Sequence, residues 1–162
     1  MSDPWVRGAR LGIDVGTVRI GVAKCDPDGI LATPLVTLQR DNSLDVAEIS
    51  FEGGDAPRVP ADITEIARLV AEHDSVEVVV GLPVNLAGVE GPAAKKIREY
   101  ARILAAVIMP VPIVMADERM STVTAARRLS DRGVKGKRQR AVVDQAAAVE
   151  ILQHYLDSRR RT

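Results

Sequence analysis

The chain has 162 residues, of which 46% are hydrophobic and only 2% are aromatic. This length suits one domain with a core of its own, and that core must be built from aliphatic side chains. No apolar run reaches the length of a membrane span and no signal peptide is visible, so we expect a cytoplasmic protein with no membrane partner. Cys25 is the single cysteine, which excludes an internal disulfide and a cysteine-based zinc site. We expect it to pack on a strand rather than to pair with a second copy.

The charges are balanced overall but unevenly distributed along the chain. Residues 1–126 carry 12 Lys/Arg and 18 Asp/Glu, a net charge of −6. Residues 127–162 carry 10 Lys/Arg and 4 Asp/Glu, a net charge of +6. Such asymmetry indicates a polyanionic partner more strongly than the total charge does.

The predicted elements begin with three strands, at about residues 10–15, 19–25 and 31–38. Asp26-Pro27-Asp28-Gly29 is a turn signal between the second and the third. Pro34 indicates that the third strand lies at the edge of a sheet, because proline cannot donate a ladder hydrogen bond. Residues 39–60 are rich in acids, glycine and proline, and we expect a mobile acidic loop there, to which we assign no role.

Helices and strands then alternate along the rest of the chain. The apolar spacing predicts elements at residues 61–73 (helix), 76–80 (strand), 92–107 (helix), 113–115 (strand), 121–130 (helix) and 141–157 (helix), with a basic loop through residue 140 before the last. The run Val76–Val80 is typical of a central parallel strand. The layout is mixed α/β with right-handed crossovers. No domain boundary is visible, so residues 1–162 are expected to form a single domain.

The first two strands form a hairpin that carries an acid in an unusual place. On the first strand, apolar residues alternate with Gly12, Asp14 and Gly16, so one face is apolar and the other carries a lone carboxylate between glycines. An acid in mid-strand is costly to bury without a partner, and the glycines let another group approach the backbone. We infer a metal or a phosphate at Asp14. The alternative is an aspartate that caps its own hairpin.

Two further groups of polar residues follow the predicted parallel strands. The loop Gly81–Gly91 lies at the carboxyl end of a central strand, where ligands bind in open α/β sheets. Its amides, the Asn85 side chain and the next helix N-terminus suit a phosphate. Asp117 and Glu118 end the next strand, where they can share a metal or, alternatively, favour the start of a helix. Arg119 can neutralise them or hold a phosphate.

Asp144 lies on the apolar face of the last predicted helix. That face holds Asp144, Ala147, Ala148, Ile151 and Tyr155. An acid there needs a partner, and a divalent cation shared with Asp14 would be one. We therefore predict that Asp14, Glu118 (with Asp117 as the substitute) and Asp144 are metal ligands and catalytic residues. Carboxylates without histidine or cysteine select Mg²⁺ or Mn²⁺, and two such ions can activate water and stabilise a leaving oxygen.

Residues 127–140 form the basic stretch of the chain. They hold seven Lys/Arg and one acid, and basic residues spaced along a flexible loop suit a phosphodiester backbone rather than base-specific contacts. The alternative is a solvated charged loop. The predicted nucleic-acid-binding residues are Arg19, Asn85, Arg119, Arg132, Lys135, Lys137, Arg138 and Arg140.

Four motifs follow one another along residues 10–156. They are Gly12-Ile13-Asp14-Val15-Gly16 with Arg19–Ala23, Val80-Gly81-Leu82-Pro83, Asp117-Glu118-Arg119 with Ser121-Thr122, and Asp144–Ala148 with Ile151-Leu152. As a set they resemble the YqgF family, also called the RuvX or Holliday junction resolvase family. The resemblance implies a ribonuclease H-like fold, a mixed five-stranded sheet with three antiparallel and then two parallel strands flanked by helices. It also implies a metal-dependent endonuclease that processes the 5′ end of pre-16S rRNA in ribosome biogenesis, or that resolves Holliday junctions.

The sequence departs from the expected pattern in two places. The acidic segment is longer than the family pattern needs. Relative to ribonuclease H, the motif Gly81-Leu82-Pro83 has no carboxylate, so the second metal-ligand role is transferred to Glu118. Symmetric resolution of a four-way junction needs two active sites and would imply a homodimer.

Two other classes of function stay open. The first hairpin also resembles the phosphate-binding hairpin of actin and sugar kinases, which would make the chain a nucleotide-binding module. Those proteins close two such domains around the nucleotide, and the basic stretch has no purpose in that interpretation. The other class is a nucleic-acid-binding protein that has lost catalysis. The only argument against it is that the predicted metal-binding acids are all present.

Overall fold

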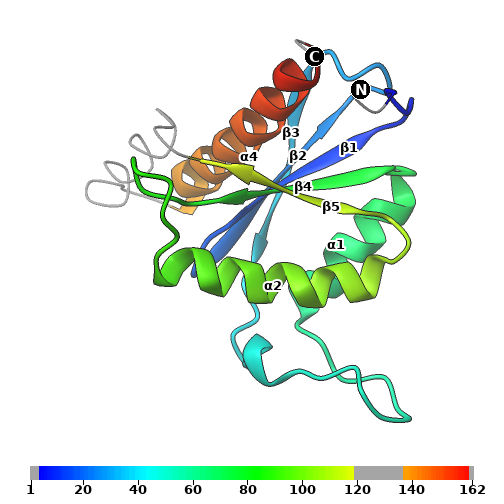
Figure 1. Ribbon diagram of the computed structural model, residues 1–162, viewed down its shortest axis with the longest axis vertical. Helices are drawn as coiled ribbons and strands as arrows, with labels where there is room; N and C mark the ends of the chain where they lie inside the picture. Colours follow the sequence, from blue (N-terminus) through cyan, green and yellow to red (C-terminus); the bar gives the residue numbers. More distant parts are fainter. Residues whose placement is uncertain (1–3, 119–136, 161–162) are drawn as a thin grey trace.

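The computed structural model describes residues 4–118 and 137–160, which form one sheet with helices on both faces (Figure 1). The strands are β1 (Arg10–Val15), β2 (Arg19–Cys25), β3 (Ala32–Gln39), β4 (Glu77–Leu82) and β5 (Ile113–Asp117). The helices are α1 (Ala61–Glu72), α2 (Pro92–Ile108) and α4 (Lys137–Arg160), with a short 3-10 helix η1 (Val46–Glu48). None of these helices is both long enough and apolar enough to cross a membrane.

The strand order is β3-β2-β1-β4-β5. β1 pairs antiparallel with β2, and β2 pairs antiparallel with β3, whereas β1 pairs parallel with β4 and β4 with β5. β3 is an edge strand, as Pro34 predicted. Its pairing with β2 shifts between Val22, opposite Val36, and Ala23, opposite Pro34. Leu35 is therefore the extra residue of a β-bulge, which accommodates the proline.

The core lies in two layers, one on each side of the sheet. α1 and α2 cover one face, where Leu11 and Ile13 of β1 pack with Ile66 and Tyr100. α4 covers the other face, where Ala148 and Leu152 pack on Ala23 and Val79. Alternation along β1 and β2 thus sends apolar side chains to α1 and α2, and sends small residues to α4. Cys25 is buried in the α4 layer, as expected.

The last helix begins earlier than the sequence predicts. Residues 137–140 were expected to end a basic loop, but α4 starts at Lys137. Lys, Arg and Gln are strong helix formers, yet these four residues carry no apolar spacing that a pattern could detect. The helix predicted at 121–130 and the basic residues 127–136 lie outside the described residues.

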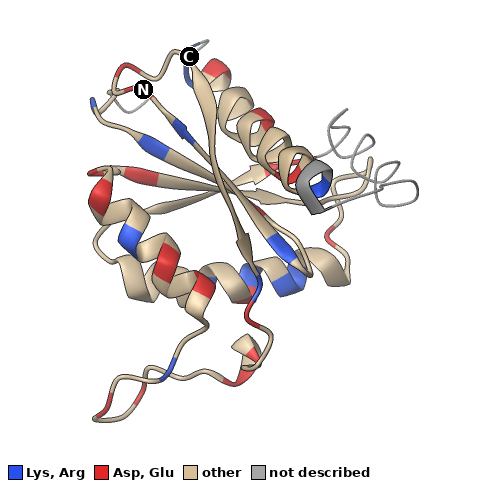
Figure 2. Ribbon diagram, turned by 180° about the vertical axis from the view of Figure 1, so that it is seen from behind, with Lys and Arg blue, Asp and Glu red and all other residues tan. Residues whose placement is uncertain are grey.

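The acidic segment, residues 39–60, extends away from the sheet as a loop that carries η1 (Figures 1 and 2). Its two ends are joined at Asp41, whose Oδ2 accepts a hydrogen bond from Ala61 N at 2.9 Å. The Ser43 hydroxyl and that amide lower the pKa of Asp41 to about 2. Arg102 of α2 donates to the carbonyl of Ile49 at 3.1 Å. The segment is therefore tied at its base, and its mobility stays a prediction.

Helix α4 approaches the sheet at glycines. A Cβ added to Gly12 would lie 2.9 Å from the carbonyl oxygen of Ala148, and one added to Gly21 would lie 2.0 Å from that of Asp144. The sequence suggested that the glycines beside Asp14 on the first strand, Gly12 among them, leave room for a metal or a phosphate. At these two positions the group that approaches is the backbone of α4.

Gly21→Ala is expected to destabilise the protein by about 3 kcal/mol, at the upper end of the range for overpacking, because its Cβ would meet backbone rather than a movable side chain. Urea unfolding measures the change. Gly54→Ala is the matched control, since a Cβ there has no atom within 4 Å. Equal stability of the two variants would show that α4 does not pack as closely as described.

Candidate active site

Asp14 lies at the end of β1 where the carboxyl ends of the parallel strands meet. Its side chain is almost completely buried, with a relative exposure of 3%. Its cross-strand neighbour in β2 is Gly21. On the other side, Ile13 pairs with Val80, which places Gly81 of β4 next to Asp14 in the parallel register. The strands on both sides of Asp14 therefore present glycine at its level.

Asp144 is brought to this site by the close approach of α4 to Gly21. Its Oδ2 accepts a hydrogen bond from Arg19 Nε at 2.6 Å. The relative exposures of the two side chains are 15% for Arg19 and 8% for Asp144, so this ion pair is largely withdrawn from water. The sequence correctly indicated that Asp144 needs a partner, but suggested only a cation. The structure supplies Arg19, which was predicted to contact nucleic acid.

Glu118 lies over the end of β4. Its amide donates to the carbonyl of Leu82 at 3.0 Å, and a Cβ added to Gly81 would lie 2.6 Å from its Oε1. Asp117, in register with Leu82, is exposed. Of the two acids that end β5, Glu118 is therefore the one whose carboxylate occupies the space that Gly81 leaves open.

These positions bring the three predicted acids to one edge of the sheet. Asp14 comes from β1, Glu118 from the end of β5 and Asp144 from α4, around the glycines of β2 and β4. Their oxygen donors suit Mg²⁺ or Mn²⁺ in chemistry. Within residues 4–118 and 137–160, however, no group of three or more His, Cys, Asp or Glu side chains is close enough to hold a metal ion. The donor set fits a hard cation, whereas a complete three-carboxylate cage is not assembled.

Asn85 has a structural role in the loop after β4. Its Oδ1 accepts hydrogen bonds from the backbone amides of Ala87 and Val89, both at 2.9 Å. The backbone amide of Asn85 donates to the carbonyl oxygen of Val89 at 3.0 Å. The side-chain oxygen thus closes the turn. Its contact with a phosphate stays a prediction, and the side-chain NH2 group of Asn85 would make that contact.

The motif set found in the sequence has a counterpart in a known family. A sequence model of the family described as "RuvX: Holliday junction resolvase" matches residues 8–52 and 54–158. The chain belongs to the RuvX family.

Relatives in this family are similar along nearly the whole length of this chain. One from Rhodococcus opacus (strain B4) is 52% identical over 162 residues, which is 100% of this chain and 84% of the relative. One from Streptomyces avermitilis is 53% identical over 154 residues, which is 95% of this chain and 88% of the relative. Both carry the name "Putative pre-16S rRNA nuclease".

Solved structures share the fold at low sequence identity. "T. thermophilus RuvC in complex with Holliday junction substrate" aligns with a TM-score of 0.55 at 16% identity, over 94% of this chain and 96% of that one. "Thermus thermophilus RuvC structure" aligns with a TM-score of 0.54 at 16% identity, over 95% and 97%. The predicted ribonuclease H-like fold, with its mixed five-stranded sheet, is confirmed.

The basic residues of this RuvX-family chain are only partly described. Arg119, Arg132 and Lys135 lie outside the described residues, and Lys137 and Arg138 are placed only as the first residues of α4. Arg140 is half-buried in the first turns of α4, and its Nε is buried with no hydrogen-bond partner among the described residues. Its predicted role in binding nucleic acid is untested.

Two residues next to the site are not among the residues predicted from the sequence. Arg40 and Asn42 follow β3 and donate hydrogen bonds to the turn that joins β1 to β2. Both lie in the segment 39–60, which was expected to be a mobile acidic loop. An arginine and an asparagine directly after a strand were the only signal, and it is too common to be specific.

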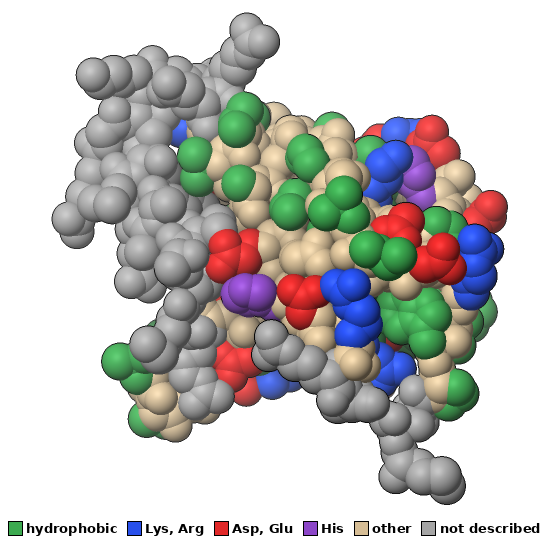
Figure 3. All heavy atoms as spheres, turned by 90° about the horizontal axis from the view of Figure 1, so that it is seen from above, with side chains coloured by type: hydrophobic (Ala, Val, Ile, Leu, Met, Phe, Trp, Pro, Cys, Tyr) green, Lys and Arg blue, Asp and Glu red, His purple; other side chains and the backbone are tan. Residues whose placement is uncertain are grey.

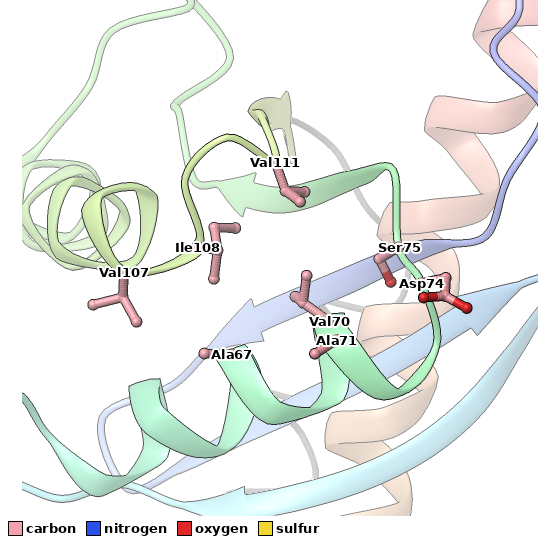
Figure 4. A pocket seen from close by; sticks show the side chains of 8 residues that line it. All are labelled: Ala67, Val70, Ala71, Asp74, Ser75, Val107, Ile108 and Val111. Atoms are coloured by element: carbon pink, nitrogen blue, oxygen red, sulfur yellow. The ribbon is translucent and has the colours of Figure 1, made fainter.

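Two other surfaces lie away from Asp14. At the end of the molecule where the termini lie, acidic, basic and hydrophobic side chains are interspersed (Figure 3), so no single charge dominates that view. An open apolar groove of about 340 Å³ lies between the ends of α1 and α2 (Figure 4). It is lined by Ala67, Val70, Ala71, Asp74, Ser75, Val107, Ile108 and Val111. These residues precede β4 and β5, so the groove is at the opposite edge of the sheet from Asp14.

Proposed function

We propose that this chain is a divalent-metal-dependent endonuclease of the cytoplasm that hydrolyses phosphodiester bonds in structured nucleic acid, with the 5′ end of pre-16S rRNA as its substrate. The observation that carries the proposal is the convergence of Asp14, Glu118 and Asp144 at one glycine-lined edge of the sheet. The names of the relatives that are 52% and 53% identical support the choice of RNA.

We infer that Asp14, Glu118 and Asp144 would hold Mg²⁺ or Mn²⁺. Magnesium commonly takes one or two protein carboxylates and completes its coordination with water and substrate phosphate, so the lack of a complete protein cage among the described residues agrees with this role. When bound, the metal would activate water and stabilise the leaving oxygen. Arg19 would orient the Asp144 carboxylate and balance its charge.

The alternative substrate is a four-way DNA junction. It is supported by the description of the family and by the RuvC structure that contains a Holliday junction. Symmetric cleavage would need a homodimer with two sites. The nucleotide-binding alternative is not favoured, because the backbone of α4 occupies the face that Gly12 and Gly21 leave open.

The test compares matched substrates with one preparation of the protein. A pre-16S rRNA 5′ fragment and a four-way DNA junction are each incubated with Mg²⁺, with Mn²⁺ and with EDTA. We expect metal-dependent cleavage of the RNA at a defined site. Cleavage of the junction alone would select the alternative, and full cleavage in EDTA would refute the metal dependence.

The basic stretch is expected to bind the nucleic-acid backbone without reading its sequence. Replacing Lys135, Lys137 and Arg138 by Ala should weaken binding to all sequences alike. If each makes one phosphate contact, the slope of log K against log [salt] should fall by about 0.7 to 0.9 for each residue lost. Fluorescence anisotropy over a salt series measures it. An unchanged slope would show that these residues face solvent and do not bind.

A further inference from the structure

The turn between β1 and β2 is held from outside by residues that follow β3. Its three carbonyl groups, at residues 16–18, all accept hydrogen bonds. Arg40 Nη1 donates to Gly16 O at 2.7 Å, and Arg40 N donates to Val18 O at 2.8 Å. Asn42 Nδ2 donates to Thr17 O at 3.1 Å. A turn held at every carbonyl has little freedom to move relative to the rest of the sheet.

Arg40 is itself seated on a buried acid. The Asp62 side chain, on α1, has no exposed surface, and its Oδ2 lies 4.0 Å from Arg40 Nε. The guanidinium carbon of Arg40 lies 4.8 Å from the centroid of the Tyr100 ring, on α2. The Tyr100 hydroxyl donates to the same Oδ2 of Asp62. We call Arg40, Asp62 and Tyr100 the Arg40 cluster.

The protonation of Tyr100 favours this arrangement. Burial raises the pKa of its hydroxyl, and the charge of Asp62 raises it further. The hydroxyl therefore stays protonated and remains a donor at neutral pH. A buried carboxylate needs both hydrogen bonds and a nearby positive charge. Arg40 supplies the charge and also donates hydrogen bonds to the turn.

The inner side of the same turn carries the site. Arg19 is the first residue of β2 and donates to Asp144 at 2.6 Å. Asp14 is the second residue before the turn and pairs with Gly21. A shift of the turn would therefore move Arg19 relative to Asp144, and move the carboxylate of Asp14 with it. In a catalytic constellation a displacement of about 1 Å can cost on the order of 10²-fold in rate.

We propose that the Arg40 cluster positions the β1–β2 turn, and through it Arg19 and Asp14, for phosphodiester hydrolysis; this inference rests on the nuclease function proposed above. Arg40, Asp62 and Tyr100 are positioning residues and do not contact substrate. They link α1 and α2, on one face of the sheet, to the acid on α4, on the other.

The chain offers a matched control at the opposite end of the sheet. Arg10 Nη1 donates to the carbonyls of Val6 and Gly8, both at 2.7 Å, and Arg10 Nε pairs with Glu77 at 3.2 Å. The Tyr155 hydroxyl donates to Glu77 at 2.7 Å. This cluster has the same chemistry of an arginine, an acid and a tyrosine. It lies where β1 and β4 begin, whereas Asp14 lies near the end of β1.

The experiment compares Arg40→Lys and Tyr100→Phe with Arg10→Lys and Tyr155→Phe. Lysine keeps a charge near Asp62 but cannot both pair with the acid and reach the turn as the planar guanidinium does. We expect kcat to fall roughly 10- to 100-fold in the first pair, with KM within about twofold. The second pair should cleave at the wild-type rate, although all four variants lose some stability in urea.

A second readout does not depend on cleavage. The side-chain N–H signal of Arg19, assigned by its loss in Arg19→Lys, reports the ion pair with Asp144 by NMR. Its hydrogen exchange should quicken by about tenfold or more in Arg40→Lys and Tyr100→Phe, and stay unchanged in the two control variants. If wild-type protein cleaves nothing, the proposed function fails, but this comparison still tests the positioning. Unchanged exchange in both Arg40-cluster variants, or an equal change in the controls, would overturn the inference.

Discussion

Asp14→Asn is expected to abolish cleavage while leaving the fold intact. The substitution keeps the shape of a side chain that is only 3% exposed, but it removes the charge that we propose binds the metal. Losing several kcal/mol of transition-state stabilisation corresponds to a rate fall on the order of 10³-fold or more. A gel-based cleavage assay with Mg²⁺ or Mn²⁺, on protein whose circular dichroism matches the wild type, measures it.

The neighbouring acids provide the control for this substitution. Glu118→Gln should lose activity in the same way as Asp14→Asn, because its carboxylate lies over Gly81. Asp117→Asn, at an exposed position one residue earlier, should retain most of the activity. Near wild-type cleavage by Asp14→Asn, in a preparation free of contaminating nuclease, would sink the assignment. A reversed result for Asp117 and Glu118 would make Asp117 the ligand.

The second large effect is expected at Asp144, where the structure adds a loss of stability to the expected loss of cleavage. If its only partner were a metal ion, an acid on an apolar helix face could be replaced by alanine in metal-free protein without loss of stability. The ion pair with Arg19 predicts instead that Asp144→Ala destabilises the protein by about 3 kcal/mol, because it leaves a largely buried guanidinium without its acid. Urea unfolding of Asp144→Ala, Arg19→Met and the double variant gives the coupling energy.

Asp144→Asn separates the ion pair from the metal. Its side-chain oxygen can still accept a hydrogen bond from Arg19, so the loss of stability should be smaller than in Asp144→Ala, whereas cleavage should be lost as in Asp14→Asn. Mn²⁺ should raise the melting temperature of the wild type, because it binds the native state, and raise that of Asp144→Asn less. Full metal-dependent activity in Asp144→Asn would mean that the only task of this acid is to anchor Arg19.

Local pattern predicted the order of the described strands and α-helices, and it singled out the three acids that the structure places at one end of the sheet. The alternation around Asp14 predicted the first strand, Pro34 predicted the edge, and the β-branched run before Gly81 predicted the central parallel strand. These features are decided by near neighbours in the chain, through steric fit, backbone donors and the period of a strand. The start of α4 was misplaced because its first turn has helix propensity but no apolar period.

Partners far apart in the chain were decided by the tertiary structure. Arg19 and Asp144 are 125 residues apart, and Arg40, which follows β3, pairs with Asp62 on α1. No local pattern marks such a pair, since a charge is acceptable at either position until the fold removes water from both.

By itself the sequence determined which residues carry charge, which positions hold glycine and which segments alternate apolar and polar residues. These patterns predicted the sheet, its helices and the acids at the carboxyl ends of its parallel strands. Only the tertiary structure decided that Gly21 admits the backbone of α4, that Glu118 lies over Gly81, and that Asp144 pairs with Arg19. The physical reason is that the cost of burying a charge is set by the atoms that replace water around it, and those atoms come from elements that the chain brings together only by folding.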